Sequence, residues 1–122
     1  GNQLGVLVEF EDELPNDEIG KNIAMQVAAM KPLAVVRDGV DSSIVDQERQ
    51  IAKDQLLNEG KPEHIAEKAS EGKLRRFYEE NVLLEQKYVK DNNMSIKEYL
   101  ESNDAPLVKA FHRLQLGEEA GS

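Results

Sequence analysis

Two histidines, His64 and His112, are the side chains of this 122-residue chain best suited to acid–base chemistry or metal binding. Neither stands in a catalytic or metal-binding pattern, because the chain contains no HExxH, no GxSxG and no cysteine. A surface histidine is the simpler interpretation of both. The sequence therefore predicts no enzyme, no metal site and no cofactor.

Two short runs, EGKP at 59–62 and EGKL at 71–74, resemble part of a phosphate-binding loop. Both lack the earlier glycine and the following Ser or Thr that such a loop requires, so neither indicates a nucleotide site. Carboxylate pairs such as Glu79-Glu80 and Glu118-Glu119 are explained by a solvated acidic surface, since acidic residues are abundant throughout. We therefore expect no small-molecule substrate.

The one basic cluster is formed by Lys73, Arg75 and Arg76, which could bind an acidic partner or simply form a solvated helix face. The 15 basic and 24 acidic residues give a net charge of −9, which disfavours nucleic-acid binding. No apolar run approaches the roughly 20 residues of a membrane span, and no signal peptide opens the chain. These features, with the absence of cysteine, favour a cytoplasmic protein that binds another protein.

The spacing of hydrophobic residues along the chain predicts a body of mixed α+β structure. Residues 5–10, 33–36 and 105–119 have the pattern of strands, the last with an irregularity near Phe111-His112, and we expect them in one small three-stranded antiparallel sheet. A helix from about residue 17 to Pro32 carries a broad apolar stripe that includes Ile23 and Val27. Ser95 is expected to cap a further short helix.

The middle of the chain, residues 42–79, predicts a different element. A helix capped by Ser42 or Ser43 ends near Gly60, and a second helix follows from Pro62. Each has only a narrow apolar seam, so we expect an antiparallel helical hairpin that projects from a body made of residues 1–41 and 80–122. The apolar positions assigned to the second helix are Ile65, Ala66, Ala69, Leu74 and Phe77, and Gly72 is expected to let the two helix backbones approach closely.

The runs NIAMQVAAMKPL and EGKPEHIAEKASEGKLRRFYEENVLLEQKYVKD, with the later Phe111, Arg113 and Leu116-Gly117-Glu118, resemble the C-terminal half of the elongation factor Ts family. The resemblance covers nearly the whole chain. It implies a guanine nucleotide exchange factor that promotes GDP release from elongation factor Tu. The part present would be the second core subdomain with its coiled-coil arm, which docks on elongation factor Tu or joins two copies into a dimer.

Two differences from the family pattern are Gln26, where the family often has His, and Tyr88, where it often has Phe. The family's N-terminal helical domain and its Thr-Asp-Phe-Val exchange element have no counterpart in these residues. The expected partner-binding residues are Gln26, Met30, Lys73, Arg75, Arg76 and His112. A non-catalytic interaction module with a coiled-coil arm and an unknown partner remains the alternative.

Overall fold

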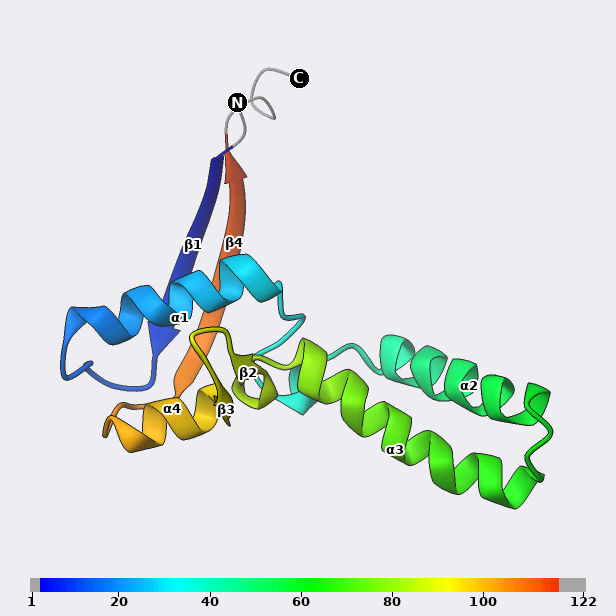
Figure 1. Ribbon diagram of the computed structural model, residues 1–122. Helices are drawn as coiled ribbons and strands as arrows, with labels where there is room; N and C mark the ends of the chain where they lie inside the picture. The colour runs from blue at the N-terminus through cyan, green and yellow to red at the C-terminus, as the bar shows by residue number, and fades with distance from the viewer. Residues whose placement is uncertain (1–2, 117–122) are drawn as a thin grey trace.

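The computed structural model describes residues 3–116, which form a mixed body and a pair of long helices (Figure 1). The elements in chain order are β1 (Gln3–Phe10), α1 (Asp17–Met30), the 3-10 turn η1 (Arg37–Gly39), α2 (Ser42–Asn58), α3 (Glu63–Asn81), the 3-10 turn η2 (Leu83–Glu85), β2 (Lys87–Tyr88), β3 (Asp91–Ser95), α4 (Ile96–Ser102) and β4 (Val108–Leu116). The part of the last expected strand beyond residue 116 lies outside the described residues.

The first and last strands pair, as the sequence predicts. β1 and β4 form an antiparallel ribbon in which Val8 lies opposite Phe111, and α1 crosses this ribbon (Figure 1). The register shifts at Glu9 and Phe10, whose partners are Ala110 and Val108, so Lys109 is the extra residue of the bulge. The irregularity is therefore real and lies two residues before the expected position.

The expectation of a single three-stranded sheet is wrong. The described strands form two separate two-stranded sheets, β1–β4 and β2–β3. Residues 33–36 make only an isolated parallel bridge, between Ala34 and Val82. The reason is that their backbone groups bond to the turn after α3: the Leu33 N–H donates to the Asn81 carbonyl at 2.7 Å, and Ala34 accepts from Leu83 at 2.8 Å.

The main core lies where α1 meets η2, β2, α4 and the start of β4. Ile19, Ile23 and Val27 supply the α1 side of this core, at the helical spacing seen in the sequence. The other fully packed members are Leu83, Leu84, Tyr88, Ile96, Leu100 and Val108. Residues far apart in the sequence therefore hold α1 in place.

The helix starts show which capping residues are used. α4 begins with a complete capping box, in which the Ser95 side chain and the Glu98 side chain each accept a backbone N–H of the other residue. The cap expected at Ser42 or Ser43 is wrong, because Asp41 caps α2. Its carboxylate accepts from the Ser43 N–H at 2.9 Å and from the Ser43 hydroxyl at 2.8 Å. These contacts lower the pKa of Asp41.

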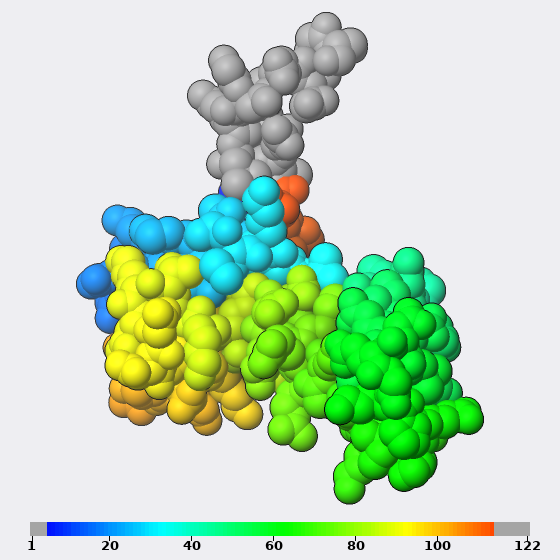
Figure 2. All heavy atoms as spheres, turned by 45° about the vertical axis from the view of Figure 1, so that its right-hand side comes forward, coloured from blue at the N-terminus to red at the C-terminus, as the bar shows by residue number. Residues whose placement is uncertain are grey.

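The two long helices, α2 and α3, lie antiparallel and lead away from the β1–β4 ribbon, as a lobe at one side of the molecule (Figures 1 and 2). Their buried seam consists of Ala52, Leu56, Ala66, Ser70 and Leu74.

That seam differs in two ways from the expected one. Ile65 and Ala69 are exposed, so assigning them to the seam is wrong. The close approach at Gly72 is also wrong, because a Cβ added there would meet no atom within 4 Å. A single row of small and medium side chains therefore holds the pair together.

Alanine at two glycines should change stability in opposite directions. Gly60 has a φ of 87° in the turn between α2 and α3, where a Cβ is strained, so Gly60→Ala should lower the free energy of unfolding by about 1 kcal/mol. Gly72 lies inside α3 with open space around it, so Gly72→Ala should raise it by about 1 kcal/mol. Urea unfolding followed by circular dichroism measures both, and a shift of the same sign would contradict the assignment.

Candidate protein-binding surfaces

A functional site in this protein must be built from side chains that the fold brings close together. Within residues 3–116, no three His, Cys, Asp or Glu side chains lie close enough to hold a metal ion. No helix in this part of the chain is long and apolar enough to cross a membrane. The remaining candidates are surfaces with exposed apolar or charged side chains.

One apolar surface lies at the end of α1, where Met30 is 43% exposed, Leu33 49% and Val36 48%. Leu33 and Val36 line a hollow of about 340 Å³, whose other wall is the β4 segment 109–111. We call residues 30, 33 and 36 the α1–η1 surface. Clustered exposed apolar side chains are typical of protein–protein contact sites, so Met30 is placed where a partner could reach it.

Gln26 is not on that surface, so the structure gives no support to its expected role in partner binding. Its side chain is fully buried. The amide nitrogen donates to Gln86 Oε1 at 3.2 Å and to the Lys87 carbonyl at 3.0 Å, and Oε1 accepts from the Val89 N–H at 3.0 Å. Gln26 therefore fastens α1 to β2. Its position three residues after Ile23, on the apolar stripe, was the signal for this burial.

A second hollow, also of about 340 Å³, lies beside the start of α1 and has a polar lining. Lys90 Nζ donates to Asn22 Oδ1 at 2.7 Å, and Asn22 Nδ2 donates to the Tyr99 hydroxyl at 2.9 Å. The rings of Tyr99 and Tyr88 lie 4.4 Å apart. Burial, with a smaller contribution from Tyr99, raises the pKa of Tyr88 to about 12. These groups satisfy one another and join α1 to α4.

The basic cluster of the sequence divides on α3. Lys73 and Arg76 line a hollow of about 450 Å³ together with Ala69 and Gly72. Lys73 Nζ also donates to Gln55 Oε1 of α2 at 3.3 Å. Arg75 is exposed but does not line this hollow. The three cations therefore do not form one patch.

His112 lies on the β1–β4 ribbon, far from the α1–η1 residues in sequence. Its Nε2 is 3.4 Å from Glu9 Oε1, and both side chains are about half exposed. Leu7, directly opposite His112, is 57% exposed. This outer face of the ribbon carries a histidine–carboxylate pair in water.

Sequence reasoning missed a contact at the base of the α2–α3 pair. Arg37 Nε and Nη2 donate to the two carboxylate oxygens of Glu85, each at 2.7 Å. The same guanidinium lies 4.5 Å from the ring centre of Tyr78. The hydrogen bond to Glu85 raises the pKa of Arg37. The two partners are 48 residues apart, so no local pattern could have paired them.

Leucine at two neighbouring α1 positions should separate a buried polar role from a surface one. Gln26→Leu leaves the Val89 N–H without its acceptor and should lower the free energy of unfolding by about 2 kcal/mol. The exposed neighbour provides the control, since Met25→Leu should change it by no more than about 0.5 kcal/mol. Equal effects in thermal or urea unfolding would contradict the buried network.

The family model described as "Elongation factor TS" matches residues 1–118. Elongation factor Ts of Christiangramia forsetii is 44% identical over 119 residues, which are 96% of this chain and 43% of that protein. The Clostridium kluyveri protein of the same name is 45% identical over 126 residues, which cover 97% of this chain and 41% of that protein. The Porphyromonas gingivalis protein is 40% identical over 117 residues, which cover 95% of this chain and 42% of that protein.

The chain thus spans about two fifths of the length of the curated relatives it matches. The family match nonetheless covers nearly all of the 122 residues. The chain therefore belongs to the elongation factor Ts family, of which it represents one segment.

Proposed function

We propose that this chain is the docking segment of a guanine nucleotide exchange factor that acts in the cytoplasm on elongation factor Tu. The family supports the partner, and the α1–η1 surface is the observation that carries the docking role. Residues 42–79 would form an inserted coiled-coil arm, and residues 1–41 with 80–122 the body. Met30 on the body, Lys73, Arg75 and Arg76 on the arm, and His112 on the ribbon are the proposed contact residues.

Docking by this segment alone is not expected to drive exchange. An exchange factor must bind the nucleotide-free state better than the GDP-bound state, because only differential affinity shifts an equilibrium. The three residues that define the α1–η1 surface, Met30, Leu33 and Val36, are apolar and offer no ligand for a phosphate or a magnesium ion. Docking that is equal for both nucleotide states leaves the affinity for GDP unchanged, however tight it is.

The proposal is tested by binding and release measured in parallel. We expect the chain to bind purified elongation factor Tu and to change the rate of release of a fluorescent GDP analogue by less than about twofold, with a full-length exchange factor as positive control. A large acceleration by this chain would overturn the division between docking and exchange. Failure to bind would instead favour the interaction module with another partner.

A matched pair of substitutions tests the surface. Leu33→Asp places a charge in the α1–η1 surface and should weaken binding to elongation factor Tu at least about tenfold. Leu57→Asp introduces the same charge at an exposed leucine of α2 and should leave binding nearly unchanged. Equal effects would contradict docking through the body.

Because the same apolar surface could join two copies, sedimentation velocity of the chain alone would identify a dimer that Leu33→Asp dissociates.

A further inference from the structure

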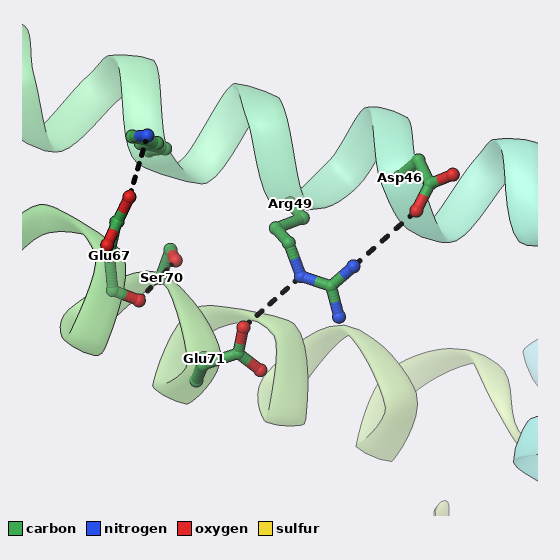
Figure 3. Close-up of polar contacts among 6 residues, drawn as sticks. Asp46, Arg49, Glu67, Ser70 and Glu71 are labelled. Atoms are coloured by element: carbon green, nitrogen blue, oxygen red, sulfur yellow. Dashed lines mark hydrogen bonds and ion pairs between the residues drawn. The ribbon is translucent and has the colours of Figure 1, made fainter.

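The two flanks of the α2–α3 pair differ in chemistry. On one flank, Arg49 Nε lies 3.2 Å from Glu71 Oε1, and Lys53 Nζ lies 3.2 Å from Glu67 Oε1 (Figure 3). Lys53 is also 3.7 Å from Glu63. Among the described residues, every ion pair between α2 and α3 lies on this flank. Charged side chains thus close one side of the seam.

The other side, which we call the open flank, has no such closure. Its members come from both helices: Ile51 and Gln55 of α2, and Ile65, Ala69, Gly72, Lys73 and Arg76 of α3. Ile51 is 43% exposed and Ile65 41%. The α3 positions 65, 69, 72 and 76 recur at spacings of four, three and four, which place them along one side of the helix. An apolar and small-residue row therefore faces outward there.

The open flank is hollowed along this row. The hollow of about 450 Å³ is lined by Ala69, Gly72, Lys73 and Arg76. A second hollow of about 150 Å³ lies between the helices, where Ile51, Gln55 and Lys73 meet Phe77 and their neighbours. Gly72 contributes to the depth, because the space that its Cβ would enter is empty to 4 Å. The two hollows share Lys73 as a lining residue, and we call them together the groove.

The charge at this groove points to an acidic occupant. Lys73 and Arg76 line the larger hollow, and the one hydrogen bond that the structure shows for the Lys73 ammonium goes to the neutral Gln55 side chain. Among the described residues, Glu48 is the one carboxylate that lines either hollow, and it lines the smaller one, so the two cations outnumber it. Carboxylates on an incoming helix would complement both cations. A nucleic acid fits less well, because the exposed Ile51 lines the smaller hollow and the chain has a net charge of −9.

We propose that the open flank binds an acidic amphipathic helix of a partner protein, packed as a third helix against α2 and α3. The 4-3-4 spacing on α3 is that of a coiled-coil seam, so the occupant would present small and apolar residues every three or four positions, with Asp or Glu beside them. This surface is separate from the α1–η1 surface, so it does not depend on which protein binds the body.

The test uses a synthetic peptide of about three heptads, with Ala and Leu at the a and d positions and Glu at e and g. The repeated glutamates discourage the peptide from associating with itself. Titrated into the whole isotope-labelled chain, it should shift the amide resonances of residues 65–76 more than those of the body. Binding should weaken as salt is raised, because Lys73 and Arg76 contribute electrostatically.

Arg75 and Arg76 provide a matched control, because they carry the same charge and lie next to each other in α3. Arg76→Glu, at the groove, should raise the dissociation constant of the peptide at least about tenfold, whereas Arg75→Glu, which does not line it, should change it less than about threefold. Gly72→Leu places a side chain in the groove at a position where a Cβ meets no atom within 4 Å, and it should abolish binding while α3 stays helical by circular dichroism.

Three results with the peptide would overturn the proposal. They are no binding of the acidic peptide, equally tight binding of the same peptide with Lys in place of Glu, and equal losses for Arg75→Glu and Arg76→Glu. A single-stranded RNA oligonucleotide that bound the groove in preference to the peptide would likewise overturn it. Lys73, Arg75 and Arg76 are also proposed contacts of elongation factor Tu, so binding of each arm variant to that protein is measured in parallel. The Leu33→Asp variant reports on docking through the body independently of the arm.

Discussion

The structure depends on the hydrogen bonds that fasten both ends of the α2–α3 pair at one place. The chain leaves the body through residues 33–36 and returns through 81–84, and backbone bonds of 2.7 to 3.2 Å join the two segments. The bidentate contact between Arg37 and Glu85 lies beside them. The main core between α1, α4 and the strands includes no residue of 42–81. At the junction itself, Ile44, Val45, Phe77 and Tyr78 pack against Ala34, Val40 and Val82.

The sequence predicted correctly those elements that depend on residues close together in the chain. The spacing of Ile23 and Val27 indicated a buried helix, and Gly60 indicated a turn with positive φ, which is observed. The strand expected at 33–36 did not form because the backbone groups of Leu33, Ala34 and Val35 bond to residues 81–84, which lie about 50 positions later. The cap of α2 could not be assigned because Asp41, Ser42 and Ser43 are all good capping residues, and only the backbone geometry selects Asp41.

The candidate surfaces were less predictable than the elements, because exposure depends on tertiary packing. Met30 follows the buried Val27 at helical spacing, yet it is exposed because it lies past the end of the core. Gln26 has a polar side chain at a buried position, where a network across three backbone and side-chain groups satisfies it. Lys73, Arg75 and Arg76 are consecutive or nearly so in sequence, but helical geometry turns Arg75 away from the other two.

The thin seam of α2 and α3 explains why their base matters. Its members include Ala52, Ala66 and Ser70, which bury little apolar area, and exposed ion pairs such as Arg49–Glu71 contribute at most about 1 kcal/mol each. A helix pair of this kind would be marginal alone. The backbone bonds between residues 33–36 and 81–84 already hold the two ends of the helix pair together. They therefore lower the conformational entropy cost of bringing α2 and α3 into contact. The outward faces of the two helices contribute little to this packing, so substitutions there can change binding without a large loss of stability.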